Sequence, residues 1–167
     1  MKKFTVPAFY QGYVKLATEE NIVEGLENNE KEILDFFVRL AGEKFNYRYA
    51  PGKWTVREVL QHVTDNERIL SYRALRISRG DKTPLAGYEQ DDYVNALKIN
   101  HLRNEDLIGE WRAVRHASKI QFRNMHPDLY EYEGFANNNN FNVEFLGRVI
   151  IGHARHHLEI LKERYLK

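Results

Sequence analysis

Residues 55–80 read TVREVLQHVTDNERILSYRALRISRG, and they carry the clearest structural signal in the chain. Thr55 and Glu58 have the spacing of a capping box, in which each side chain bonds to an amide donor of the first helical turn. After them, apolar residues recur mostly at helical spacing, as on one buried face: Val56, Val59, Leu60, Val63, Leu70, Ala74 and Ile77. Gly80 is a suitable helix stop. This stretch therefore predicts a long amphipathic helix.

Three other segments show the same periodicity. They run from about residue 21 to 42, from Asn104 to about 125, and from near 142 to the C-terminus. Asn104 is expected to be the N-cap of its helix, because its side chain can accept from first-turn amides. Residues 130–134 alternate like an extended segment, but one strand makes no sheet. Four amphipathic helices of this length favour an all-α four-helix bundle.

The connections between these helices differ in length. Residues 45–53 form a loop that ends near the turn-forming pair Pro51-Gly52. Residues 81–103 form a much longer connection, with a short helical turn near 93–97. Loops of this length inside a small domain are uncommon and often functional. Neither a repeat nor a linker interrupts the chain, so we expect a single domain over residues 1–167.

The composition excludes several kinds of chemistry. The chain has 167 residues, seven histidines and no cysteine, which excludes disulfides, iron–sulfur clusters and a cysteine nucleophile. A metal site would have to use nitrogen and oxygen ligands. The 25 Lys+Arg and 24 Asp+Glu give a net charge of +1, which disfavours nucleic acid as a partner. The sequence has neither a signal-like apolar segment nor a membrane-length apolar run, so we expect a cytoplasmic protein without a membrane partner.

Two histidines on the last helix are the first candidates for a site. His153 and His157 are four residues apart, so they lie about 6 Å apart on one helix face, which they share with apolar residues. Two adjacent buried imidazoles are costly to protonate together, and a divalent metal would take one lone pair from each. The alternative is a pair of buried histidines without a metal.

His62 is a possible third donor, at the edge of the helix that begins after Thr55. A neighbouring helix can meet that edge, although a histidine there can also bond to a backbone carbonyl or to water. His156 points about 100° away from His157, towards the side of the helix or the solvent.

Other polar residues have two possible roles. Glu67 lies near the apolar stripe of its helix, where it can form a salt bridge between helices or act as a catalytic carboxylate. Arg73, Tyr88 and Asp92 can support a substrate pocket or simply pack the long connection. The sequence identifies none of them as a catalytic residue.

Several motifs resemble those of the DinB/YfiT-like superfamily. Residues 51–68, PGKWTVREVLQHVTDNER, resemble its second-helix signature, and residues 72–85 resemble the end of that helix and the following loop. Residues 87–94, GYEQDDYV, are similar to the next loop motif, and residues 153–157 resemble the motif of the final helix. Their order and spacing make the resemblance specific.

The resemblance implies a four-helix bundle with up-up-down-down connectivity, often as a homodimer. It also implies a divalent metal, typically zinc or nickel, held by three histidines. Those positions correspond here to His62, His153 and His157. Three imidazoles leave coordination positions open for water or a substrate, as in catalytic zinc sites.

Characterised relatives are mycothiol-dependent maleylpyruvate isomerases and S-transferases that use bacillithiol or glutathione. The resemblance therefore implies a metal-dependent enzyme that transfers a low-molecular-weight thiol, as a co-substrate, to a small electrophile. Two alternatives stay open. One is a metal-dependent hydrolase with the same site, and the other is a non-catalytic bundle whose metal is structural or sensory. Fold membership alone does not fix the reaction.

Overall fold

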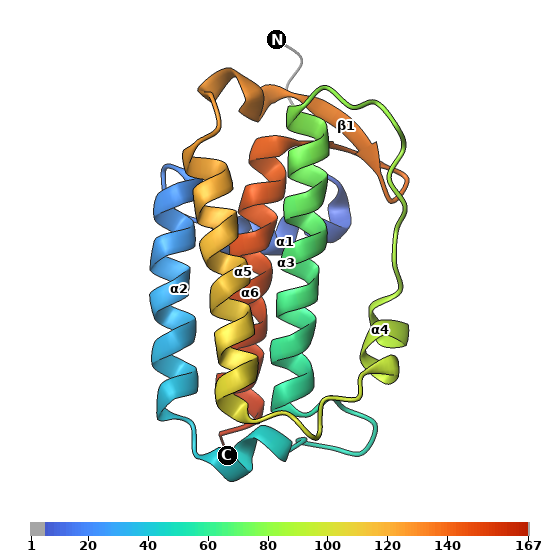
Figure 1. Ribbon diagram of the computed structural model, residues 1–167. Coiled ribbons are helices and arrows are strands. Elements are labelled where there is room, and N and C mark those ends of the chain that lie inside the picture. Colours follow the sequence, from blue (N-terminus) through green and yellow to red (C-terminus); the bar gives the residue numbers. More distant parts are fainter. Residues whose placement is uncertain (1–5, 167) are drawn as a thin grey trace.

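The computed structural model describes residues 6–166, and its centre is a bundle of four long helices (Figure 1). These are α2 (Ile22–Arg39), α3 (Val56–Ser78), α5 (Asn104–Arg123) and α6 (Val143–Arg164). Shorter elements surround them: α1 (Gln11–Leu16), α4 (Gln90–Ala96), strands β1 (Glu133–Ala136) and β2 (Asn139–Asn142), and 3₁₀ turns at Ala8–Tyr10, Gly42–Asn46 and Pro127–Glu131. The predicted all-α four-helix bundle is confirmed.

Side chains cap the starts of α3 and α6, but not the start of α5. The Thr55 amide donates to the Glu58 carboxylate (2.6 Å) and the Glu58 amide donates to the Thr55 hydroxyl (3.3 Å), so the capping box is present. Asn142 caps α6 by accepting from the amide of Phe145. The expected N-cap at Asn104 is wrong, because Arg103 occupies that position. The Asn104 carboxamide instead accepts from Arg57, a tertiary contact that local sequence does not reveal.

The directions of the helices differ from the expected order. Glu67 pairs with Arg115 and Ser71 bonds to Ser118, so α3 and α5 run parallel. Gly147 of α6 packs on Ile22 of α2, and about one turn later Ile151 of α6 packs on Gly25 of α2. These two helices are therefore also parallel. The connectivity is therefore up-down-down-up and not up-up-down-down. The connections before α3 and before α6 each reverse the direction of the chain, whereas the connection over residues 79–103 runs back along the bundle, so that α5 begins at the same end as α3 (Figure 1).

A polar layer divides the core of the bundle. Buried apolar side chains form one cluster toward the hairpin and a second cluster toward the start of α3. Between them, the guanidinium of Arg115 makes two 2.8 Å bonds to the carboxylate of Glu67 and a 2.7 Å bond to Asn29. Both charged side chains are almost completely buried. Of the two roles considered for Glu67, the structure supports the salt bridge between helices.

A short hairpin precedes α6, and the sequence analysis missed it. Asn137 and Asn138 form its two-residue turn with φ angles of 45° and 58°, the left-handed region that asparagine tolerates. The segment before α4 attaches to this hairpin, because Leu85 donates to the carbonyl of Phe135 and accepts from the amide of Asn137. Gly87 lies so close to Asn137 that a Cβ there would collide with its carboxamide. The long connection is thus ordered by the hairpin.

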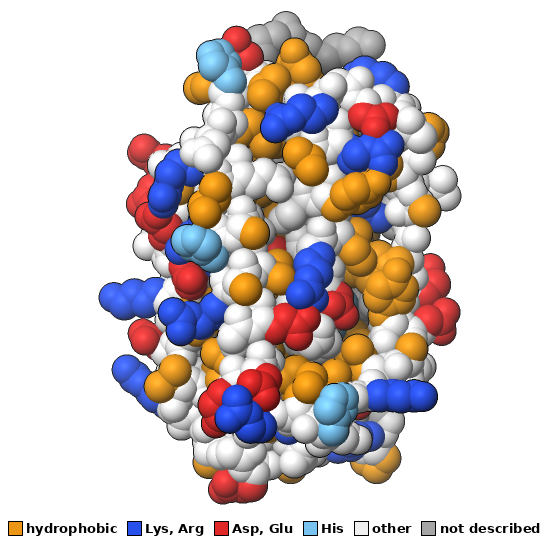
Figure 2. Space-filling model, viewed as in Figure 1, with side chains coloured by type: hydrophobic (Ala, Val, Ile, Leu, Met, Phe, Trp, Pro, Cys, Tyr) orange, Lys and Arg blue, Asp and Glu red, His pale blue; other side chains and the backbone are white. Residues whose placement is uncertain are grey.

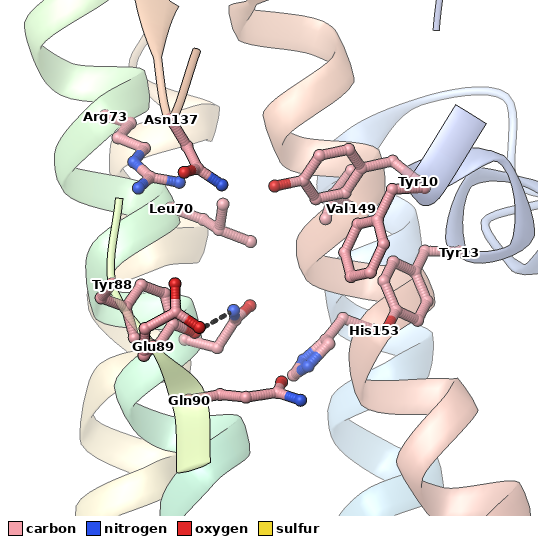
Figure 3. A pocket seen from close by; sticks show the side chains of 12 residues that line it. Tyr10, Tyr13, Leu70, Arg73, Tyr88, Glu89, Gln90, Asn137, Val149 and His153 are labelled. Carbon is pink, nitrogen blue, oxygen red and sulfur yellow. Dashed lines mark hydrogen bonds between the residues drawn. The ribbon is translucent and has the colours of Figure 1, made fainter. Parts of the chain in front are cut away.

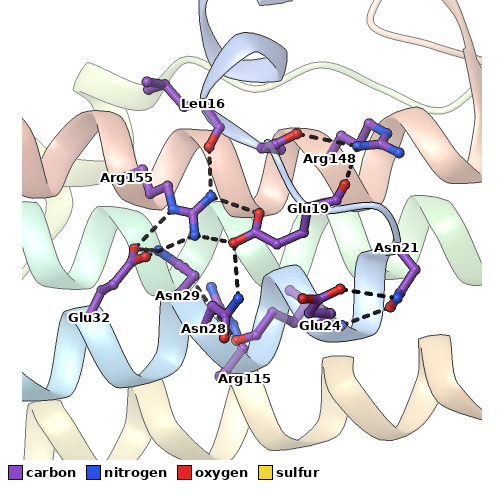
Figure 4. Close-up of polar contacts among 12 residues, drawn as sticks. Leu16, Glu19, Asn21, Glu24, Asn28, Asn29, Glu32, Arg115, Arg148 and Arg155 are labelled. Carbon is purple, nitrogen blue, oxygen red and sulfur yellow. Dashed lines mark hydrogen bonds and ion pairs between the residues drawn. The ribbon is translucent and has the colours of Figure 1, made fainter.

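The N-terminal segment is fastened to α6, and the sequence analysis did not predict its helical turns. Arg155 donates to the carbonyl of Leu16 and pairs with both Glu19 and Glu32 (Figure 4). At the close approach of α1 to α6, a Cβ at Gly152 would collide with the backbone carbonyl of Tyr13. These contacts hold α1 against the middle of α6.

The surface mixes charges of both signs. Figure 2 shows Lys and Arg side chains interspersed with Asp and Glu side chains over the visible face, with apolar side chains between them. This face has no broad basic patch of the kind that binds a phosphate backbone. Among the described helices, none is both long and apolar enough to cross a membrane.

We expect Gly152→Ala to destabilise the protein, because the added Cβ would push the Tyr13 carbonyl and α1 away from α6. Overpacking of this kind costs about 1–3 kcal/mol of unfolding free energy. Gly109→Ala is the matched control, since this helical glycine is exposed and has open space around it. It should gain about 0.5–1 kcal/mol. Urea denaturation followed by circular dichroism measures both, and equal effects would contradict the close contact.

We expect Arg115→Leu to cost about 3–5 kcal/mol of stability, because it leaves the Glu67 carboxylate buried without its partner. The double variant Arg115→Leu/Glu67→Leu should recover most of this loss. Arg103→Ala, which removes an exposed ion pair with Asp106, should leave the denaturation midpoint unchanged. The same denaturation experiment distinguishes these cases. Equal losses in the single and double variants would mean that the unpaired carboxylate is not the cause.

Candidate metal centre

Three histidines from two helices meet beside the polar layer. His62 comes from α3, and His153 and His157 come from consecutive turns of α6. One ring nitrogen from each lies within 4.8 Å of the other two, and the Nε2 atoms of His62 and His153 are 3.0 Å apart. His62 and His153 are buried and His157 is partly buried. The structure therefore brings together the three residues that the resemblance implies.

Their positions follow from helix geometry. The four-residue spacing puts His153 and His157 on one face of α6, as expected. Because α3 runs antiparallel to α6, His62 faces this pair from the neighbouring helix. Sequence periodicity placed His62 at the edge of its helix, but it is only 3% exposed, because α6 and Trp54 cover it.

The electrostatic environment keeps the imidazoles neutral. Burial lowers the pKa of His62 to about 4. Burial also lowers the pKa of His153 and His157 well below the usual value, and the proximity of other imidazoles lowers it further. Neutral imidazole is the form that binds a metal, so all three rings offer a lone pair near neutral pH.

The donor set fits a divalent transition metal. Metal–nitrogen bonds of about 2.0–2.1 Å in a tetrahedral site put ligand nitrogens about 3.3 Å apart, close to the 3.0 Å between His62 and His153. A hydrogen bond between these two rings would use only one lone pair and would leave His157 without a role. Three imidazoles match the ligand number of catalytic zinc sites.

Aromatic rings surround the histidines. Trp54 lies 4.8 Å from the ring of His62 and stacks at 6.4 Å on His157. Tyr13 meets His153 edge-on at 5.4 Å. These apolar ring faces limit the access of water to the imidazoles. The sequence analysis gave neither residue a role, since Tyr13 arrives through the unpredicted docking of α1.

A pocket of about 270 Å³ adjoins the cluster, and His153 forms part of its wall (Figure 3). Its lining residues come from the N-terminal segment, α3, the segment before α4, the tip of the hairpin and α6: Phe9, Tyr10, Tyr13, Asn66, Leu70, Arg73, Tyr88, Glu89, Gln90, Asn137, Val149 and His153. The pocket therefore connects the metal centre with parts of the chain that only tertiary structure brings together.

The other candidate residues from the sequence lie in different places relative to this pocket. Arg73 and Tyr88 line the pocket, whereas Glu67 is occupied by Arg115. Asp92 is exposed on α4 and is not among the lining residues. His156 is partly buried, with its ring 5.2 Å from that of Tyr13. Sequence reasoning missed Tyr10, Asn66 and Asn137, which local patterns do not distinguish from ordinary packing residues.

Comparison with known proteins agrees with this architecture. The family model of the DinB superfamily matches residues 26–161, which includes all four bundle helices or most of each. The chain belongs to the DinB superfamily. Among curated proteins, no sequence matches the chain.

The chain also shares its fold with a protein of known structure. YfiT from Bacillus subtilis, described as "a probable metal-dependent hydrolase with an unusual four-helix bundle topology", aligns with a TM-score of 0.73 over 98% of this chain and 90% of its own. The sequence identity is 14%, so the likeness concerns the fold.

We expect protein incubated with zinc or nickel and then desalted to retain a stoichiometric amount of metal. His62→Ala and His153→Ala should each abolish this retention, because two imidazoles hold a metal far more weakly than three. His156→Ala is the control, since His156 neighbours the cluster but its nitrogens lie outside it. Elemental analysis by mass spectrometry gives the metal content. Wild-type protein without bound metal would contradict the site.

Proposed function

We propose that this chain is a divalent-metal-dependent enzyme that acts on a small molecule in the pocket beside His153. His62, His153 and His157 would hold the metal, most simply zinc or nickel. The observation that supports this most directly is the placement of three neutral imidazoles, two buried and one partly buried, around one point, with one of them in a pocket wall. A single-domain chain, a cytoplasmic location and a homodimer remain predictions.

The metal, when bound, would supply a positive charge that stabilises a small nucleophile as an anion. The protein's own residues do the rest. The neutral histidines donate lone pairs, and burial keeps protons from competing for them. Trp54 stacks on His157 and Tyr13 meets His153 edge-on, and both rings limit the access of water to the imidazoles. Leu70 and Val149 give the adjoining pocket apolar walls.

A low-molecular-weight thiol is our first candidate for the nucleophile. The resemblance to thiol-using S-transferases supports it, and the absence of cysteine means that any reactive sulfur must arrive with a ligand. In the proposed reaction the thiol releases its proton to solvent water, its sulfur bonds to an electrophilic carbon, and the leaving group departs as an anion with the electron pair of the broken bond. The substrate class would be small electrophiles.

Water is the second candidate, which would make the chain a hydrolase. The fold shared with YfiT and its description as a probable metal-dependent hydrolase support this alternative. A purely structural metal is less well supported, because structural sites are closed by four protein ligands. Among the described residues this cluster has three ligands, and one of them, His153, lines a pocket.

The test compares two activities of the zinc- or nickel-loaded protein. With monochlorobimane as electrophile and cysteine, glutathione or bacillithiol as thiol, we expect a conjugation rate that needs both metal and thiol. His153→Ala should reduce this rate to the uncatalysed background, while His156→Ala should retain it. Fluorescence of the conjugate measures the rate.

Hydrolysis of p-nitrophenyl acetate without thiol is the second assay. Turnover that needs metal but no thiol would support the hydrolase and contradict the transferase. Fully metal-loaded protein that is inactive with every thiol and ester would contradict both enzymes and favour the non-catalytic bundle.

A further inference from the structure

Arg73 is a buried arginine that faces the pocket without an acidic partner. It comes from α3, its side chain is 3% exposed, and one guanidinium nitrogen donates to the carbonyl of Ala86 at 2.8 Å. Among the described residues, no carboxylate lies within ion-pair distance of it. Its other polar neighbours are the hydroxyl groups of Tyr10 and Tyr88. A guanidinium has five donors, and the partners of Arg73 among the described residues are this carbonyl and the tyrosine hydroxyl groups, none of them an anion.

Two other arginines inside the protein, the buried Arg115 and the partly buried Arg155, are paired with carboxylates. Arg115 has the bidentate partner Glu67, and Arg155 has Glu19 and Glu32. A buried charge without a counter-ion costs several kcal/mol, so such pairing is the ordinary solution. Burial accordingly lowers the pKa of Arg73.

Arg57 also lacks a carboxylate, but its position is different. Two of its nitrogens donate to the carbonyl of Ile99 and to Asn104, and it lies at the start of α3, outside the pocket lining. Its bonds fasten the starts of two helices. Arg73 has no such interhelical bond, which distinguishes a structural arginine from one that faces a cavity.

The pocket has two chemically different ends. In Figure 3, Arg73 and the carboxamide of Asn137 lie at one end, with the Tyr10 hydroxyl pointing toward them, and His153 lies at the other. Leu70 and Val149 lie between the two ends (Figure 3). The backbone of the hairpin turn fixes Asn137 there, and the contact with Gly87 holds its carboxamide. The buried Oδ1 atom of Asn66, which lines the same pocket, has no hydrogen-bond partner in the part of the chain that the structure describes.

We propose that Arg73 binds the carboxylate of a small monocarboxylic acid substrate and so directs the rest of the molecule along Leu70 and Val149 toward His153. A carboxylate matches the planar, bidentate guanidinium. One arginine surrounded by neutral donors suits a single negative charge, and Glu89 in the same lining opposes a more highly charged group. The volume of about 270 Å³ is at the lower end for ligand sites, which suits a small acid.

This inference rests on the proposed function only for the reaction at the metal centre. The binding of an acid at Arg73 needs the pocket alone, so it can be tested with and without metal. The probes are hexanoate and benzoate, with hexanamide and benzamide as neutral molecules of the same shape. Isothermal titration calorimetry measures their binding to the full chain.

We expect both acids to bind wild-type protein at least tenfold more tightly than their amides, in chelator-treated as well as zinc-loaded protein. Arg73→Gln should weaken the acids at least tenfold and leave the amides unchanged, while Arg73→Lys should retain part of the preference. Arg57→Gln is the matched control, because it also removes a buried arginine without an acidic partner, and it should leave acid binding unchanged. Circular dichroism and metal content check that the variants are folded.

Nuclear Overhauser contacts between bound hexanoate and the methyl groups of Leu70 and Val149 test the same proposal in wild-type protein, whatever the stability of the variants. Acids that bind no better than amides, or equally well to Arg73→Gln, would overturn the proposal. So would binding that disappears when the metal is removed, since the acid would then be a metal ligand. Protein that binds acids but no metal would support the role of Arg73 and contradict the proposed function.

Discussion

The need to pair the charge of Arg115 at the centre of the bundle is the constraint on which the other contacts depend. A guanidinium that is completely buried cannot keep water as its partner, so the carboxylate of Glu67 and the carboxamide of Asn29 must meet it. These three residues come from α5, α3 and α2, and their bonds fix the relative heights of the three helices. With α3 held at this height, His62 faces His153 on α6. One ion pair thereby positions a site to which it contributes no atom.

The polar groups on the two sides of this layer have different environments. The guanidinium of Arg115 bonds to Glu67, Asn29 and the carbonyl of Leu26, so its own donors are satisfied within the protein. Around the pocket, the three imidazoles keep free lone pairs, Arg73 lacks a counter-ion and the Oδ1 atom of Asn66 lacks a donor. Groups left unsatisfied at a cavity cost stability, and they are explained if a ligand completes them. The same physical rule applies to the imidazoles, whose lone pairs need a cation, and to Arg73, whose charge needs an anion.

The sequence was sufficient for features that depend on local chemistry. The capping box at Thr55, the start of the last helix near residue 142, and the one-turn spacing of His153 and His157 are properties of single helices. Periodicity offered His62 as a possible third donor at a helix edge, and the resemblance to the superfamily grouped it with His153 and His157. The sequence was insufficient where contacts between segments far apart in the chain determine the structure. The side chain of Asn104 bonds to Arg57 and does not cap its helix, and the long connection after α3 makes α5 parallel to α3 where the antiparallel direction was expected. Four consecutive asparagines gave no strand signal, yet two of them form a turn that their left-handed conformations allow. Arg73 was visible in the sequence, but its missing partner was not, because the pocket is assembled from segments far apart in the chain.

The distribution of stability within the fold bears on what a metal would do. Small domains that lack a sufficient core use metals or disulfides as staples. This chain has two apolar clusters and ion pairs that tie α1 and α2 to α6, so its fold has interactions independent of the histidines. A metal is then free to keep open coordination positions, because closing them is not needed to hold α3 against α6. The pocket borders the cluster through His153, where an open position would be useful to a reaction and would contribute nothing to a structural site. The fold has apolar clusters and ion pairs that do not involve the histidines, and the cluster offers only three ligands among the described residues. This contrast favours a catalytic role for the metal over a structural one.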